Sequence, residues 1–379
     1  MPSLFDPIGL GAITAPNRIL MAPLTRGRST RQHVPTPIMA EYYRQRASAG
    51  LIITEATGIS QQGLGWAYAP GIWSAEQVEA WKPVTASVHD AGGRIFCQLW
   101  HMGRVVHPSF LDGASPVSAS ATKAPGSAHT YDGKQPYVEA RSLSPHEIPN
   151  IVDDYRHAAR NAMAAGFDGV EIHGANGYLI DQFLRDSANL RDDAYGGPVE
   201  NRVRFLREIT QAVAGAVGAD RTAIRLSPNG DSQGVNDSDP ETLFATVGAV
   251  LSEIGLAFVE LREPGLDGTF RKADRPPVAP TIRRAFKGPL ILNSDYDGRK
   301  AQAALDVGDA DAIAFGRAFL ANPDLPYRLA ENISLTEDDT GTWYTQGPEG
   351  YTDYPASSSS ATPRSSTRAI FMVKEGVAD

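Results

Sequence analysis

The sequence predicts a (β/α)8 barrel, and its repeated pattern of short apolar runs and helices is the main reason. A helical tail, a glycine and a short apolar run recur, as in residues 47–55 (ASAGLIITE) and 163–173 (MAAGFDGVEIH). The glycine fits a helix end, where the backbone takes a positive φ. The apolar runs are continuous rather than alternating, which is typical of parallel strands buried on both faces. Eight such units favour a closed barrel over an open doubly wound sheet.

The predicted strands are distributed along most of the chain, and each is followed by a helix or a loop. Such alternation makes consecutive strands parallel. The eight strands are Ile19–Ala22, Leu51–Glu55, Arg94–Leu99, Gly169–His173, Ala223–Leu226, Phe258–Leu261, Leu290–Asn293 and Ala312–Phe315.

Capping signals predict where several of the intervening helices begin. A serine followed three residues later by Glu or Gln can form a capping box, in which each side chain bonds the other's backbone N–H. The helix that starts near Pro198 then places apolar residues on one face. Three pairs have the capping spacing: Ser74–Gln77, Ser144–Glu147 and Ser238–Glu241.

Three segments fall outside the repeat. Leu4–Pro16 reads as a hairpin that would cap the N-terminal end of the barrel. Pro108–Arg141 is a long insertion after strand 3, rich in Ser, Pro, Gly and Ala, which we expect to be a loop that forms a lid or a substrate wall. Residues 357–379 have the composition of a disordered extension. The expected organisation is one barrel domain over residues 1–356 followed by this extension.

Composition excludes several classes of protein. With 42% hydrophobic and 21% charged residues the chain is globular rather than disordered. A formal net charge of −9 gives no bulk attraction to nucleic acid. The single cysteine, Cys97, cannot form an internal disulfide, a thiolate zinc site or an iron–sulfur cluster.

Hydropathy gives no sign of a membrane or export segment. No apolar run approaches the ~18 residues that a membrane span requires. The first residues (MPSLFDPIG) lack the basic and then apolar pattern of a signal peptide. We therefore expect a cytoplasmic protein with no membrane or nucleic-acid partner.

Candidate site residues follow the strands, because barrel enzymes place their chemistry at the C-terminal strand ends. The ends carry neutral hydrogen-bonding groups and arginines, with no carboxylate pair spaced for glycoside hydrolysis, no metal-binding histidine motif and no strand-end lysine. Such an inventory suits a large polar cofactor with one anionic end. Gly316-Arg317 after strand 8 fits the phosphate site that this fold often builds there.

Several long stretches of the chain resemble one family. They include NRILMAPLTR, EYYRQRASAGLIITEAT, QLWHMGR, FGRAFLANPDLP, EGYTDYP and, after strand 4, HGANGYLIDQFLRDSANLRDDAYGGPVENRVRFLREI. In this order they resemble the Old Yellow Enzyme family of flavin-dependent ene-reductases, from about Leu4 to Pro355. The resemblance implies an FMN barrel, monomeric or homodimeric, that reduces activated alkenes with NAD(P)H in a ping-pong reaction.

The resemblance also assigns cofactor-binding roles by position. Thr25 would bond the flavin C4 carbonyl, and Gln98 and Arg225 would hold the pyrimidine edge. The bed of the ring system and the phosphate end would be formed by Pro23, Leu24 and Ala56, and by Ser294, Asp295, Gly316 and Arg317, respectively.

Substrate roles follow in the same way. His173 and Asn176 would donate hydrogen bonds to the substrate carbonyl oxygen, and Tyr178 would protonate the α-carbon. Around the substrate the resemblance places Trp66, Trp100, Gln233 and Tyr344.

The residues themselves leave alternatives open. Arg225 could be half of a buried ion pair with Glu171 or Glu260, because a buried arginine requires a partner. The aromatic residues could be ordinary core residues. Asp295 is an awkward neighbour for a phosphate unless it points away or meets Arg317.

Three other functions compete with the ene-reductase hypothesis. A larger dienoyl-CoA reductase type would need a cysteine cluster and a further domain. A flavin-free lyase or isomerase on the same barrel would be colourless. A non-catalytic flavin-binding barrel would not be expected to keep His173, Asn176 and Tyr178 together.

Overall fold

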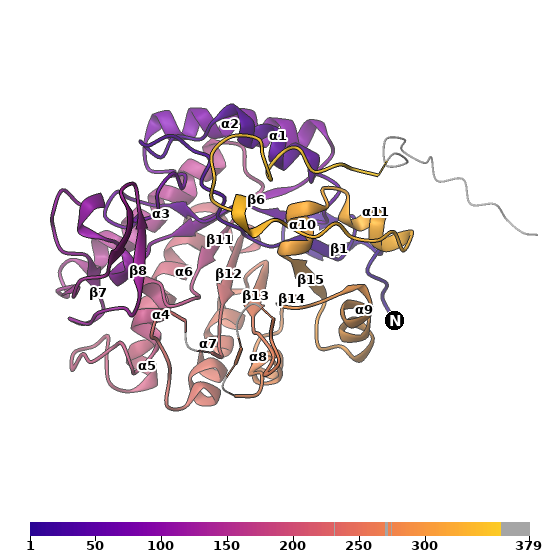
Figure 1. Cartoon of the computed structure of the whole chain (residues 1–379). Coiled ribbons are helices and arrows are strands. Elements are labelled where there is room, and N and C mark those ends of the chain that lie inside the picture. The colour runs from indigo at the N-terminus through magenta and orange to yellow at the C-terminus, as the bar shows by residue number, and fades with distance from the viewer. Residues whose placement is uncertain (231, 270–271, 274, 358–379) are drawn as a thin grey trace, which may run out of the picture.

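Eight parallel strands close into a barrel at the centre of the computed structural model (Figure 1), which describes all residues except 231, 270–271, 274 and 358–379. Pairing of the fourth strand with the third closes the ring. The predicted barrel is therefore confirmed. Its strands are β3 (Ile19–Met21), β4 (Ile52–Ile53), β6 (Ile95–Trp100), β11 (Gly169–His173), β12 (Thr222–Leu226), β13 (Phe258–Arg262), β14 (Leu290–Asn293) and β15 (Ala312–Phe315).

The second strand is shorter than the predicted Leu51–Glu55. Glu55 leaves the ladder because its carboxylate accepts hydrogen bonds from the backbone N–H groups of Arg26 and Gly27, at 3.1 Å each. The chain then returns to β6 through the short strand β5 (Thr57–Gly58). The loop after β3 is thereby tied to the loop after β4 at the barrel mouth.

Helices surround the barrel (Figure 1) and bury their apolar faces against the outer faces of the strands. One helix or helix group follows each strand. They are α1 (Pro37–Gln45), α2 (Ala75–Asp90), α3 (Ile148–Ala164), α4 (Leu179–Leu184), α5 (Val199–Arg202), α6 (Arg204–Val217), α7 (Pro240–Ile254), α8 (Ala279–Ala285), α9 (Gly298–Val307), α10 (Arg317–Ala321) and α11 (Leu325–Ala330).

One of the three predicted capping boxes forms as expected. At the start of α2, the Ser74 hydroxyl accepts from Gln77 N at 3.2 Å, and the Gln77 side chain accepts from Ser74 N at 3.1 Å. The prediction at Ser144 is wrong: its hydroxyl donates to the Glu147 carboxylate, and α3 begins only at Ile148.

The predicted cap at Ser238 is also wrong. The helix α7 is capped one residue later by Asp239, whose carboxylate accepts from Thr242 N at 3.1 Å. Pro240 explains the shift, because it occupies the first helical position, where no N–H is needed. The carboxylate of Glu241 is used elsewhere, as acceptor for the Thr281 hydroxyl.

The N-terminal segment forms an antiparallel hairpin of β1 (Ile8–Leu10) and β2 (Ile13–Ala15). Leu10 and Ile13 pack with Phe96 and Phe258 inside the end of the barrel where the strands begin. At the turn, Gly11 has φ +62° and any Cβ would lie 2.0 Å from Asp220 O, so only glycine fits.

The insertion after β6 is more ordered than the loop that the sequence predicts. It holds a hairpin of β8 (Ser127–Thr130) and β9 (Gly133–Pro136), together with the paired strands β7 (Val117–Ser118) and β10 (Arg141–Ser142). The reversal needs Gly133, which has φ +92°. The hairpin presents His129 towards the barrel mouth, where its ring lies 4.7 Å from that of Trp66.

Segment 340–357 returns across the barrel mouth and is anchored by buried arginines. The guanidinium of Arg28 donates to carbonyls at Thr342, Trp343, Gly347 and Glu349. The last described residue, Ser357, donates its N–H to Asp324. The predicted disordered extension therefore lies, apart from this residue, outside the described residues.

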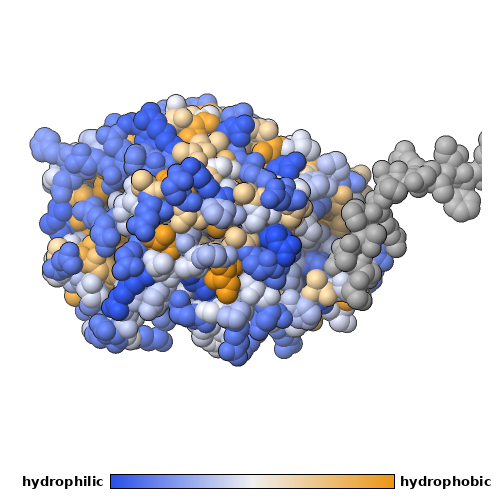
Figure 2. Space-filling model, turned by 90° about the horizontal axis from the view of Figure 1, so that it is seen from above, coloured by the Kyte–Doolittle hydropathy of each residue, from blue (hydrophilic) through white to orange (hydrophobic). Residues whose placement is uncertain are grey.

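Two observations concern the apolar parts of the described structure. Among the described residues, no helix is long and apolar enough to cross a bilayer. Figure 2 shows one face of the molecule, on which hydrophobic residues form small separate groups among hydrophilic ones. Scattered groups of this kind are normal for a protein surface.

Candidate active site

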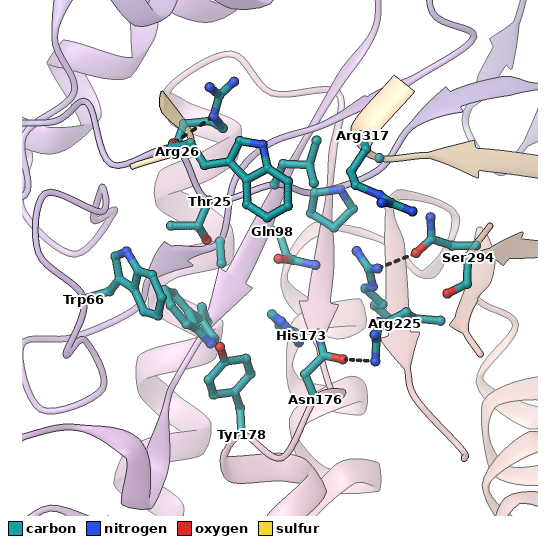
Figure 3. A pocket seen from close by; sticks show the side chains of 18 of the residues that line it. Thr25, Arg26, Trp66, Gln98, His173, Asn176, Tyr178, Arg225, Ser294 and Arg317 are labelled. Carbon is teal, nitrogen blue, oxygen red and sulfur yellow. Dashed lines mark hydrogen bonds between the residues drawn. The ribbon is translucent and has the colours of Figure 1, made fainter. Parts of the chain in front are cut away.

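A cavity of about 300 Å³ opens at the C-terminal ends of the barrel strands (Figure 3). The cavity is lined by side chains from the loops that follow most of the strands. Trp66, which follows β5, and the C-terminal segment also contribute to the lining. All of the site residues predicted from the sequence line it: Pro23, Leu24, Thr25, Ala56, Trp66, Gln98, Trp100, His173, Asn176, Tyr178, Arg225, Gln233, Ser294, Asp295, Gly316, Arg317 and Tyr344.

The floor of the cavity is polar. Arg225 on β12 donates from Nη2 to Asn293 Oδ1 at 2.8 Å, and its Nη1 lies 3.5 Å from Glu260 Oε1. The ion-pair alternative for Arg225 is thus present, yet the same side chain also lines the cavity. Its Nε is buried and has no hydrogen-bond partner among the described residues, so a donor is left for a bound group.

His173 ends β11 as a neutral ring. Burial, and then the nearby positive charge of Arg225, hold the pKa of His173 well below its ordinary value. Its Nδ1 accepts from Ala175 N at 3.3 Å. In a neutral imidazole the proton then sits on Nε2, which makes that nitrogen a donor.

Asn176 is held in a conformation that few residues adopt. Its φ is +58°, and Gly177 follows at +76°. The turn is fixed because Asn176 N donates to Ser227 Oγ at 2.7 Å and Gly177 N donates to Asp181 Oδ2 at 2.9 Å. A Cβ on residue 177 would lie 2.3 Å from Ser232 O, so the loop requires glycine there.

Tyr178 lies beside the other two residues of this loop. Its ring meets those of His173 and Trp100 edge to face, with centroids 4.9 and 5.0 Å apart. Figure 3 shows His173, Asn176 and Tyr178 on one side of the cavity, below Thr25 and Gln98. The ring contacts fix the phenol at the mouth.

The predicted phosphate end contains an unusual backbone. Ser294 has φ +126° and Asp295 has φ +52°, values that normally belong to glycine. The carboxylate of Asp295 meets Arg317, with Oδ1 and Nη2 3.0 Å apart, and also accepts from Thr269. Asp295 therefore pairs with the arginine predicted to bind phosphate.

Sequence reasoning missed several lining residues, of which Arg262 is the most informative. It ends β13, and its Nη1 lies 3.5 Å from Asn176 Oδ1. The signal was an arginine at the end of an apolar run, FVELR, similar to Arg225, which lies one residue before the end of TAIRL. The remaining missed residues are Arg26, Pro264, Asn293, Leu320 and Trp343.

His101 and Cys97 are buried side chains close to the site in sequence. His101 follows β6 and is fully buried, which lowers its pKa to about 3. Cys97 is buried within β6, and burial raises its pKa to about 12. That thiol is therefore no nucleophile. No group of acidic, histidine or cysteine side chains suited to a metal occurs among the described residues.

Comparisons with known proteins identify the class. The model of the NADH:flavin oxidoreductase / NADH oxidase family matches residues 3–336. The structure of the Old Yellow Enzyme homologue from Zymomonas mobilis superposes with a TM-score of 0.92 at 63% identity, covering 93% of this chain and 99% of that one. Morphinone reductase in complex with tetrahydroNAD gives 0.90 at 45% identity, covering 96% and 100%.

Curated relatives agree. A putative 12-oxophytodienoate reductase 11 of Oryza sativa subsp. japonica is 45% identical, over 93% of this chain and 97% of that protein. Chanoclavine-I aldehyde reductase of Penicillium roqueforti is 46% identical, over 93% and 96%. Fold and site thus define a barrel flavoprotein, an enzyme that carries out redox chemistry.

More particularly, the chain belongs to the NADH:flavin oxidoreductase / NADH oxidase family, in which it is related to Old Yellow Enzyme. Its cofactor is FMN and its reductant is NAD(P)H. The donor set of the cavity fits this cofactor, since the unpartnered Arg225 Nε and the amide of Gln98 lie on the floor and Arg317 at the far end. The flavin-free alternative is therefore excluded.

Proposed function

We propose that the enzyme reduces the C=C bond of α,β-unsaturated carbonyl compounds and similarly activated alkenes. The observation that carries the proposal is the grouping of His173, at the end of β11, with Asn176 and Tyr178, from the turn that follows, at the cavity wall. Relatives named as reductases of 12-oxophytodienoate and chanoclavine-I aldehyde support it, because both names denote small carbonyl compounds.

Two donors serve the substrate carbonyl oxygen. The neutral ring of His173 offers Nε2–H, since its Nδ1 accepts from the backbone. The Oδ1 of Asn176 faces Arg262, which leaves the Nδ2 protons for the substrate. Donors aimed at a developing enolate oxygen act as an oxyanion hole, and removal of one typically costs ~3 kcal/mol.

Tyr178 is the proposed proton donor to the α-carbon. A phenol remains protonated at neutral pH and can act as a general acid. The rings of Trp100 and His173 hold the Tyr178 side chain in place. When bound, FMN supplies the hydride that the β-carbon receives.

The cofactor-binding roles are proposed as follows. Thr25, Gln98 and Arg225 hold the polar edge of the ring system, and Arg225 offers its free Nε there. Arg317, paired with Asp295 in this structure, clamps the phosphate. Pro23, Leu24 and Ala56 form the bed on which the ring system lies. Ser294 and Gly316 supply the backbone at the phosphate end.

The alkene and NAD(P)H are proposed to occupy the same cavity in turn. One cavity opens over the cofactor-binding floor in the described part of the chain, so the first product must leave before the alkene enters. Initial rates measured with both substrates varied test this. Parallel double-reciprocal lines are expected, whereas lines that intersect at a common point would show that both substrates bind together.

A further inference from the structure

Two carboxyl groups lie in the barrel interior close to the cavity floor. Glu171 on β11 and Glu260 on β13 are both completely buried. Strand register places Glu171 beside Gln98 of β6, and Glu260 beside Arg225 of β12. The roles proposed above for catalysis and cofactor binding use Gln98 and Arg225 but neither carboxyl group.

The buried carboxyl oxygens outnumber the available donors. Glu171 Oε2 accepts from Gln98 Nε2 at 2.7 Å. Among the described residues, Glu171 Oε1 and both oxygens of Glu260 receive no hydrogen bond, and the nearest cation is Arg225, 3.5 Å from Glu260 Oε1. Two ionised carboxylates would thus share one arginine inside the barrel, which is a costly arrangement.

A single proton resolves this shortage. We propose that Glu171 is a neutral carboxylic acid whose Oε1–H donates to Glu260, and that Glu260 is the ionised partner of Arg225. The proton is assigned to Glu171 because Glu260 is the carboxyl group that contacts the arginine. Consistently, burial and then the neighbouring Glu260 raise the pKa of Glu171 well above its ordinary value.

The groups around the pair leave it electrically balanced. Arg225 from β12 is the facing cation, the His173 ring is held neutral, and Gln98 carries no charge. The neutral acid, one carboxylate and one guanidinium sum to zero. The pair therefore reduces the positive charge that Arg225 presents to the cofactor, and in this way it tunes the reduction potential of bound FMN.

Substitution to glutamine distinguishes the two carboxyl groups. Glutamine copies a neutral acid, with an amide in place of the O–H donor, but it removes the charge of a carboxylate. In the holoenzyme, Glu171→Gln should leave the midpoint potential of FMN unchanged. Glu260→Gln should raise it, because a negative charge near the cofactor is lost.

Infrared spectroscopy gives a second readout that also applies if Glu260→Gln fails to fold. The carbonyl stretch of a protonated carboxyl group should be present in the wild-type holoenzyme and lost from Glu171→Gln. The matched control is Glu263→Gln, at a partly buried glutamate whose pKa is raised to about 7; with spectra recorded well above that pH, this variant should retain the Glu171 band.

Three results would overturn the proposal. The first is an upward shift of the FMN midpoint potential in Glu171→Gln, and the second is an unchanged midpoint potential in Glu260→Gln. The third is a carboxylic acid band that remains unchanged in Glu171→Gln. The inference rests on the flavin site rather than on alkene reduction. Neither readout contains an alkene, so a failure of the proposed function would appear separately.

Discussion

Tyr178 is the residue whose substitution best separates the two halves of the reaction. Tyr178→Phe keeps the ring contacts with Trp100 and His173 but removes the proton donor. We expect alkene reduction to slow by ~10²-fold or more, as for loss of a general acid, while reduction of the enzyme by NAD(P)H stays within about 2-fold. Rapid mixing of each half-reaction measures both.

The matched control is Tyr195→Phe, since the Tyr195 hydroxyl donates to Glu208 away from the cavity. It should change neither half-reaction. If Tyr178→Phe slowed reduction by NAD(P)H as strongly as alkene reduction, Tyr178 would be needed for something other than proton delivery.

His173 leads to a prediction about pH. Burial and Arg225 depress its pKa, so the ring stays neutral in the folded enzyme where an unfolded histidine, with a pKa of ~6.5, gains a proton. The rate of alkene reduction should show no inflection near pH ~6.5. An inflection there that disappears in His173→Asn would contradict the neutral-ring assignment.

The lowered pKa of His173 also makes the free energy of unfolding depend on pH. Below pH ~6.5 the unfolded state binds more protons than the folded state, so the free energy of unfolding contributed by His173 decreases as the pH falls. His101, whose pKa is lowered to about 3, acts in the same direction. Urea unfolding at a series of pH values measures this dependence. As the pH is lowered, the free energy of unfolding should fall less steeply in His101→Asn than in the wild type.

Some site residues could be predicted from sequence and others could not. His173, Asn176 and Tyr178 follow a strand end within six positions, so their proximity needs only the local chain. The contact between Arg262 and Asn176 joins residues 86 positions apart and depends on strand register. The pairing of Asp295 with Arg317 was one of two possibilities in the sequence, and only the structure selects it.

At the scale of elements, the β8–β9 hairpin supports two aromatic residues of the cavity wall, Trp66 and Tyr344. It places His129 against Trp66 and Tyr344, with ring centroids 4.7 and 6.0 Å apart. His129→Ala should therefore favour bulky alkenes, raising their kcat/KM relative to a small enone several-fold, because such pocket contacts are worth ~1–3 kcal/mol. Steady-state kinetics with a matched pair of alkenes measures the ratio.

Lys134→Ala is the control for the hairpin. Lys134 is the exposed register partner of His129 on β9, so its loss alters the same hairpin while the His129 ring stays in place. The ratio should not change in this variant. Equal ratios in His129→Ala and the wild type would mean that the ring cluster does not restrict the substrate.

Arg28 anchors the C-terminal segment that carries Trp343 and Tyr344. It is buried and donates to several backbone carbonyls of that segment. Arg28→Gln leaves buried acceptors unpaired at ~1–3 kcal/mol each, so the free energy of unfolding should drop by ~2 kcal/mol or more, and the alkene KM should rise. Denaturant unfolding and kinetics give the two values.

Arg44→Gln provides the comparison for Arg28. Arg44 forms an exposed pair with Glu41, and pairs of that kind contribute ~0–1 kcal/mol. Its loss should leave the KM unchanged. If Arg28→Gln were as mild as Arg44→Gln, the segment would be held by its other contacts.

Predictions of elements succeeded where the signal was local and repeated. The bounds of β11, β14 and β15 match the apolar runs because these strands are continuous and buried. The cap at Ser238 failed because Asp239 and Pro240 compete for the same helix start. The β8–β9 hairpin was missed because alternating burial in SAHT is too short to distinguish from a loop.

At the scale of the whole molecule, the barrel could be predicted from the number and order of its strands. The position of the active site could be predicted from the rule that active sites in this fold lie at the C-terminal ends of the strands. The identity of the cofactor, FMN, was predicted from the resemblance to the Old Yellow Enzyme family. Composition and periodicity do not determine how the strand ends face one another, which is why the polar floor around Arg225 appeared only in the structure.

The most direct test of the central claim is the visible spectrum of the purified protein, followed without oxygen. The proposed function predicts the absorption of bound oxidised FMN, its loss when NAD(P)H is added, and its return when cyclohexenone is added. A flavin band that NAD(P)H bleaches but cyclohexenone does not restore, although it returns with oxygen, would contradict the proposal that this site reduces activated alkenes.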